Sequence, residues 1–184
     1  MKLSITFKRQ IKYIAGPLLA IFVYLFMGVM LYKALSGIKM DLVLKVLLIP
    51  IILIFLLQFV TLFFIHFNYY QNSKNEVIHF DSDAIMIIKR NNIKEIHKIE
   101  NLKKIIIHLT DAKKVGRVAR TLPSSEYYYS ELLFNDNTKV IISCLMVDDL
   151  LKFLGDHFSE DMIEYSEEMF PVISKDFPFI FKKK

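Results

Sequence analysis

The sequence has one cysteine, no tryptophan and only five glycines among its 184 residues. Because a disulfide or a cysteine cluster for zinc needs at least two cysteines, Cys144 alone excludes both within this chain. The glycines form neither a phosphate-binding loop nor the Gly-x-Ser-x-Gly turn of serine hydrolases. The five histidines include no close pair of the kind that binds metals. We therefore expect no catalytic residue, no cofactor, no metal and no enzymatic activity.

Positive charge is scarce where a nucleic-acid-binding domain would need it. Residues 1–68 hold seven basic groups and one acidic group, so the totals of 24 and 19 leave 17 basic and 18 acidic groups in residues 69–184. A domain that binds nucleic acid should carry its positive charge where it meets phosphate, whereas here the excess flanks apolar runs. We expect no nucleic-acid partner.

Long apolar runs are what the sequence has in excess, with hydrophobic residues making up 54% of the chain. No residue is charged from Tyr13 to Tyr32 or from Val46 to Ile65, and about 20 apolar residues span a bilayer as a helix. We predict two transmembrane helices at about 12–34 and 42–67, joined by a tight turn, so that residues 1–70 form a hairpin anchor. A secretory signal peptide fits less well, because the first run is too long and lacks a small-residue cleavage site.

The distribution of lysine and arginine predicts how this hairpin is oriented. Basic residues before the first run and after the second outnumber those in the turn between them, and such an excess marks the cytoplasmic side. The flanking residues are Lys2, Lys8, Arg9, Lys12 and Lys74, against Lys33, Lys39 and Lys45 in or near the turn. We expect a multi-pass protein of the inner (cytoplasmic) membrane with both termini in the cytoplasm.

After residue 73 the apolar runs become short, and turn residues separate them, as in β-strands. The predicted strands cover residues 77–80, 84–89, 94–99, 104–110, 127–134 and 139–145. The last two are separated by Asn135, Asp136 and Asn137, which tolerate the positive φ of hairpin turns, so this is the best-defined hairpin in the chain.

The C-terminal part shows a helical pattern. Asp148 and Asp149 favour a helix N-terminus, and the apolar residues that follow recur at intervals of three and four until Pro171. These residues are Leu151, Leu154, Phe158, Met162, Tyr165 and Met169. We predict an α+β domain over residues 74–170: a strongly bent sheet or split barrel of about six or seven antiparallel strands, capped by this helix. Residues 171–184 are expected to form an irregular tail.

The order of these features resembles a known family. Two apolar spans and a strand meander precede Tyr127-Tyr128-Tyr129, then the stretch from Asn135 to Leu145, then Asp149-Leu150-Leu151. This arrangement resembles the bacterial PH-like domain proteins that carry transmembrane helices beside the domain. The resemblance implies a PH-like fold, but that scaffold hosts many unrelated functions.

Two groups of residues are candidate contact sites. Four basic residues lie close together on a predicted loop, where they could contact anionic lipid or remain solvated: Lys113, Lys114, Arg117 and Arg120. Alternate strand residues face opposite sides, so at least one of Tyr127, Tyr128 and Tyr129 should point outward. Tyr127 and Tyr129 could therefore form a partner surface, although cross-strand packing is the alternative. The turn at Asp81, by contrast, is acidic where lipid-binding PH domains are basic, which disfavours inositide recognition there.

The function these features predict is that of a non-catalytic, membrane-tethered PH-like module. We expect it to bind a protein partner, or to scaffold a membrane complex, at the cytoplasmic face, in contact with the lipid bilayer. Two alternatives remain open at this point. The chain could be an accessory subunit of a transporter or secretion system, or an immunity protein against a membrane-active toxin.

Overall fold

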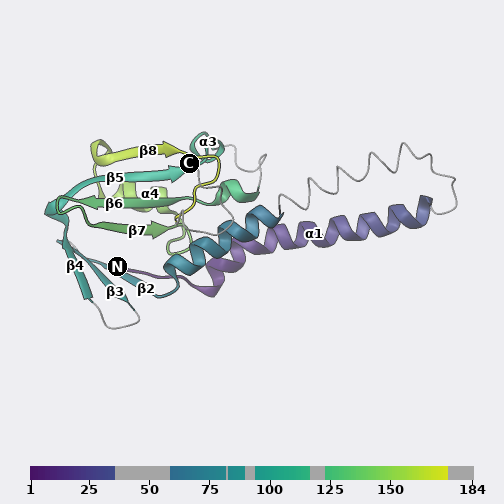
Figure 1. The fold of residues 1–184 in the computed structure, drawn as a ribbon, viewed down its shortest axis with the longest axis horizontal. Coiled ribbons are helices and arrows are strands. Elements are labelled where there is room, and N and C mark those ends of the chain that lie inside the picture. Colours follow the sequence, from purple (N-terminus) through teal and green to yellow (C-terminus); the bar gives the residue numbers. More distant parts are fainter. Residues whose placement is uncertain (36–58, 82, 90–93, 117–122, 174–184) are drawn as a thin grey trace, which may run out of the picture.

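The computed structural model describes residues 1–35, 59–81, 83–89, 94–116 and 123–173. These residues form two four-stranded sheets and one long helix, α1, that extends away from them (Figure 1). The first sheet has the strand order β1-β2-β3-β4 and is antiparallel throughout. Its strands are β1 (Lys2–Leu3), β2 (Glu76–Phe80), β3 (Ala84–Lys89) and β4 (Lys94–Lys98). The predicted strands at 77–80, 84–89 and 94–99 are thus confirmed.

The second sheet has the order β7-β6-β5-β8. Its strands are β5 (Leu102–Leu109), β6 (Tyr129–Phe134), β7 (Lys139–Ser143) and β8 (Ile163–Glu167). The short 3-10 turn η1 (Ile99–Asn101) leads from the first sheet into β5, and α3 (Asp111–Lys114) and η3 (Pro123–Glu126) lie between β5 and β6. Ile105, Ile107 and Leu109 of β5 all point into the core, as the alternation of a half-buried strand demands.

The predicted hairpin turn between β6 and β7 is present. Asn137 has φ of 62°, and its backbone N–H donates to the carbonyl oxygen of Phe134 at 3.0 Å. The side chain of Asp136 accepts the N–H of Thr138 at 2.9 Å. Asparagine tolerates this left-handed conformation better than most residues, so the sequence at this turn fits its geometry.

The prediction that the C-terminal helix continues to Pro171 is wrong beyond His157. Helix α4 covers only Leu150–His157, and Asp149 caps it by accepting the backbone N–H of Lys152 at 3.1 Å. The chain then forms η4 (Glu160–Met162) and strand β8, which runs parallel to β5. An open edge of β5 offers a row of backbone hydrogen bonds, and pairing with it prevails over the helical spacing. Tyr165 and Met169, predicted to be buried, are 53% and 79% exposed.

Strand β1 lies outside the predicted strands and makes the N-terminus part of the domain. Lys2 and Leu3 pair with His79 and Ile78 of β2, and the backbone N–H of Phe80 donates to the carbonyl oxygen of Met1 at 2.7 Å. Leu3 is only 1% exposed. Two residues are too few to show a strand period, so the sequence pattern alone places the N-terminus in the anchor.

Helix α1 (Phe7–Leu35) begins directly after β1 and continues through Pro17. Its first 24 residues, Phe7–Met30, are long and apolar enough to cross a membrane, and none of the most apolar stretch is buried. It is the one such helix among the described residues. Of the second predicted span at 42–67, residues 42–58 lie outside the described part, and residues 59–73 are helical.

The helical segment 59–73 returns the chain to the domain. Its residues Leu62, Ile65 and Tyr69 belong to the same buried cluster as the sheets and α4. Asn68 accepts the backbone N–H of Ile173 at 3.0 Å, so residues 171–173 pack against this helix. The end of the predicted anchor and the start of the predicted tail are thus both built into the core of the domain.

Candidate functional site at the base of the long helix

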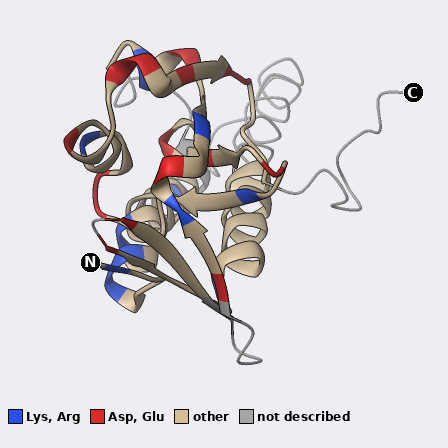
Figure 2. Cartoon of the chain, turned by 90° about the vertical axis from the view of Figure 1, so that its left-hand side faces the viewer, with Lys and Arg blue, Asp and Glu red and all other residues tan. Residues whose placement is uncertain are grey.

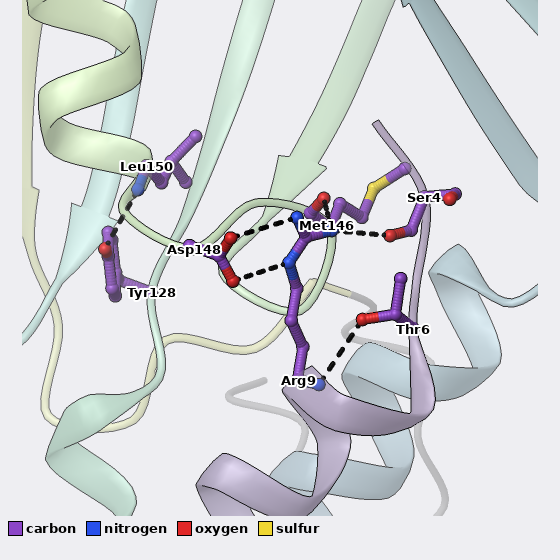
Figure 3. A network of polar contacts seen from close by, with 7 residues as sticks. All are labelled: Ser4, Thr6, Arg9, Tyr128, Met146, Asp148 and Leu150. Atoms are coloured by element: carbon purple, nitrogen blue, oxygen red, sulfur yellow. Dashed lines mark hydrogen bonds and ion pairs between the residues drawn. The ribbon is translucent and has the colours of Figure 1, made fainter. Parts of the chain in front are cut away.

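Arg9 joins the first turn of α1 to the loop between β7 and α4 (Figure 3). Its Nε donates to Oδ1 of Asp148 at 2.9 Å, and its second terminal nitrogen donates to Oδ2 at 3.3 Å. The remaining nitrogen donates to the carbonyl oxygens of Ser4, at 2.9 Å, and Met146. The hydrogen bond from Arg9 lowers the pKa of Asp148 below its usual value. One guanidinium group thereby ties together three stretches of chain.

Aromatic packing joins the same elements from the inside. The ring of Tyr127 lies 5.2 Å from that of Tyr13 on α1 and 5.3 Å from that of Tyr69 on helix 59–73. Its hydroxyl group is 2.8 Å from Nδ1 of His66. Because Tyr127 itself is fully buried, the two helices are held to the domain by core contacts and not only by the connecting chain.

The structure places the tyrosine triplet in the interior. Tyr127, Tyr128 and Tyr129 are each at most 3% exposed, so the expectation that one of them points outward is wrong. Strand β6 begins only at Tyr129, and alternation therefore does not govern the two residues before it. Tyr128 accepts the backbone N–H of Leu150 at 3.2 Å, and Tyr129 stacks on His108 at 4.5 Å. Neither Tyr127 nor Tyr129 presents a surface to a partner.

The predicted basic group is only partly described, because Arg117 and Arg120 lie outside the described residues. Lys113 pairs with Glu126 at 3.1 Å and lies 4.8 Å from the centre of the Tyr128 ring. Lys114 forms an ion pair with Glu167 on β8, which raises the pKa of this lysine. Both lysines are therefore bound to acidic groups of the domain.

A cleft of about 710 Å³ opens between α1 and the domain, next to the Arg9 contacts. It was not foreseen from the sequence, since it is built from segments far apart in the chain. Three lysines from three different helices enter it: Lys12 of α1, Lys113 of α3 and Lys152 of α4. The other lining residues are Tyr13, Pro17, Gly116, Glu126, Tyr128, Asp148, Asp149 and Leu151. Figure 2 shows basic residues on the turns of α1 that follow the N-terminus.

A second hollow, of about 310 Å³, lies at the far end of β5 and β8. Its charged walls are Asp111, Glu167 and Glu168. Glu167 is paired with Lys114, and Glu168 lies 2.7 Å from Nδ1 of His108. Two of the three charged side chains of this hollow are therefore already paired with basic groups of the domain.

Groups that could carry catalysis or bind metals are dispersed or buried. Within the described ranges, no three His, Cys, Asp or Glu side chains are placed to hold a metal ion. His97 stacks on Phe134 and His108 on Tyr129, so these two rings serve packing. Burial raises the pKa of the Cys144 thiol to about 11, which disfavours the reactive thiolate.

A model of the PH domain family matches residues 3–152, well over half of the chain. The protein therefore belongs to the PH domain family, whose members are generally non-catalytic modules that bind proteins or lipids. The match begins in β1 and includes α1, so the helices lie within the family region rather than before it. Neither the curated proteins nor the solved structures include a match to this chain.

Proposed function

We propose that this protein is a membrane-tethered, non-catalytic PH domain that binds a protein partner, or scaffolds a membrane complex, at the cytoplasmic face of the inner membrane. The single observation that carries the proposal is the exposed apolar surface of α1, a helix that follows strand β1 of the PH domain directly in the chain. Leu19, Phe22 and Phe26 are 63–69% exposed on this helix. An apolar surface of this length is unfavourable in water and matches the thickness of a bilayer.

A hairpin arrangement is supported by where the chain leaves and rejoins the domain. It leaves after β1 and is back in the domain core at Leu62, so both ends of the intervening segment attach to one domain. A second span between α1 and Leu62 would bring the chain back to the side on which it started. The excess of lysine and arginine around the domain end of α1 favours the cytoplasm for that side.

The contacts at the base of α1 suggest what the tether contributes. Arg9 and Tyr127 fix the domain to the helices, so a domain carried by these helices would keep one orientation relative to the bilayer. Confinement to a membrane raises the effective concentration of a module toward other membrane components. A fixed orientation adds to this by lowering the entropy lost when a partner docks.

Membrane insertion is tested by washing isolated membranes with alkaline carbonate. We expect the full chain to stay in the pellet and to be released by detergent. Release by carbonate alone would overturn the proposal. A reporter fused after Lys184 tests the orientation, because it should be active only in the cytoplasm.

The role of the tether is tested by exchanging residues 18–58 for an unrelated transmembrane hairpin while keeping Tyr13 and His66. If the helices are an anchor, partners cross-linked to the domain in cells should be the same for the exchanged and original chains. Loss of those partners from a folded, inserted protein would instead favour a subunit whose helices act directly.

A further inference from the structure

We propose that the cleft beside α1 holds the phosphate-bearing headgroup of a membrane lipid, with Lys12 and Lys152 as its cationic ligands. This inference rests on the proposed membrane insertion of α1. It concerns a different place from the hairpin turn at Asp81, and different residues from the loop that carries Lys114.

The ion pairs around the cleft leave two lysines uncommitted. Asp148 is bound by Arg9, Glu126 is bound by Lys113, and Asp149 accepts a backbone N–H as the cap of α4. Within the described residues, neither Lys12 nor Lys152 forms an ion pair, and both are exposed. The two ammonium groups thus enter the same cleft without a carboxylate of their own.

The charge balance of the cleft matches a singly charged phosphodiester. Counting Arg9 with the lining groups, four cations face three carboxylates, and one positive charge remains. The exposed carboxylates beside the lysines could accept hydrogen bonds from hydroxyl or amine groups of the same headgroup. A strongly anionic ligand would fit this balance less well.

The walls of the cleft indicate a lipid and not free phosphate. Tyr13 and Pro17 line it and lie four residues apart, on one face of α1. The uncharged run of the helix begins at Tyr13, directly after Lys12. If α1 spans the bilayer, Lys12 lies at the boundary between the hydrocarbon core and the headgroups. The part of the cleft wall formed by Tyr13 and Pro17 then lies on the hydrocarbon side of Lys12. A ligand with a phosphate and an acyl chain would satisfy both parts.

The test uses the full chain in a neutral detergent and measures binding of phosphatidylglycerol, with the thermal unfolding midpoint as a second readout. Diacylglycerol with the same acyl chains and inorganic phosphate are the comparison probes. We expect phosphatidylglycerol to bind and to raise the midpoint, and the other two to do neither. Saturation by inorganic phosphate alone would overturn the assignment to a lipid.

Variants separate a built site from general charge attraction. K12Q/K152Q should weaken phosphatidylglycerol binding roughly 25-fold, since each lysine near a lipid phosphate contributes about a fivefold factor. K12R/K152R should retain binding. The control K98Q/K103Q removes the same charge where the first sheet leads into the second, at the end of β4 and the start of β5, and should bind as the original chain does. Equal binding by K12Q/K152Q and the control would overturn the proposal.

Carbonate fractionation of the same variants distinguishes the two possible failures. If all chains stay in the membrane while K12Q/K152Q still binds lipid normally, only the headgroup site is wrong. If the original chain is released by carbonate, the proposal of membrane insertion is wrong, and the proposal of a headgroup site is then wrong as well. Matching unfolding midpoints without lipid show that K12Q/K152Q is folded.

Discussion

The hydroxyl group of Tyr127 lies 2.8 Å from Nδ1 of His66, a residue 61 positions earlier in the chain. Both residues are buried where helix 59–73 meets the PH domain. This contact, together with the ring of Tyr13 packed on the same tyrosine, makes the base of the helices part of the domain core. The stability of the domain should therefore depend on side chains within the predicted anchor.

Tyr127→Phe tests this dependence. The variant keeps the ring but leaves the imidazole nitrogen of His66 without its partner, which costs about 1–3 kcal/mol when the group is buried. We expect a lower thermal unfolding midpoint in detergent. Tyr70→Phe is the matched control, because Tyr70 is only partly buried and the contact of its ring with Lys74, 5.7 Å from the ring centre, does not need the hydroxyl group. Equal midpoints for the two variants would contradict a stabilising role for the contact.

Arg9→Gln should destabilise the protein more than Asp148→Asn. Loss of the guanidinium group removes its bonds to the carbonyl oxygens of Ser4 and Met146 as well as the ion pair. We expect about 1–3 kcal/mol for Arg9→Gln, since charged hydrogen bonds to partly buried groups are lost. Asp148 is 77% exposed, and its substitution should cost less than about 1 kcal/mol. Chemical unfolding of both variants measures the difference, and the reverse order would contradict this account.

The same ion pair predicts a pH dependence. Arg9 lowers the pKa of Asp148 in the folded protein, so the folded state binds this proton less readily than the unfolded state. The stabilisation is thus fully present above the ordinary aspartate pKa of about 3.9 and is lost as the pH falls through the lowered value. The midpoint difference between the original chain and Asp148→Asn should shrink in acid. In the Arg9→Gln background it should be small at every pH.

Most strands were predictable because their period is local. Strands β2 to β7 lie where alternation and turn residues placed them, and Asn137 adopts the positive φ that its residue type favours. Strands β1 and β8 were not predictable in this way. Each forms because a distant strand offers an open edge, β2 for Lys2–Leu3 and β5 for Ile163–Glu167. A two-residue strand has no period, and β8 has an apolar spacing that also suits a helix.

The candidate site was less accessible to sequence reasoning than the fold. Charge clusters such as Lys113 and Lys114 are visible in the sequence because their residues are adjacent in the chain, whereas the cleft brings together Lys12 and Lys152, which are 140 positions apart. The pairing of Arg9 with Asp148, 139 positions apart, left no local signal. The tyrosine triplet was visible as a pattern, but its burial depends on helices that only the tertiary structure brings to it.

Asn137→Val should destabilise the β6–β7 hairpin, whereas Asn137→Gly should not. A β-branched residue at φ of 62° meets steric strain of about 1–2 kcal/mol, and glycine avoids it. Asp136 caps the same turn and remains in both variants. Thermal unfolding of the two variants provides the comparison, and equal losses of stability would show that the turn relaxes to another conformation.

Cys144 should react with maleimide only when the protein unfolds. The side chain is 1% exposed, and burial raises its pKa to about 11. At pH 8 a thiol with this pKa is ionised in roughly one molecule in a thousand, against about one in four for an ordinary cysteine. Both access and ionisation therefore oppose the reaction in the folded state.

As the chain has no other cysteine, the labelling rate reports this single site. We expect slow labelling of the folded protein in detergent and fast labelling in denaturant, with Tyr127→Phe intermediate because it opens more often. A C144A chain carrying K98C, an exposed position on β4, should label quickly when folded. Equally fast labelling of Cys144 under the same conditions would show that the β7 end of the core is open to solvent.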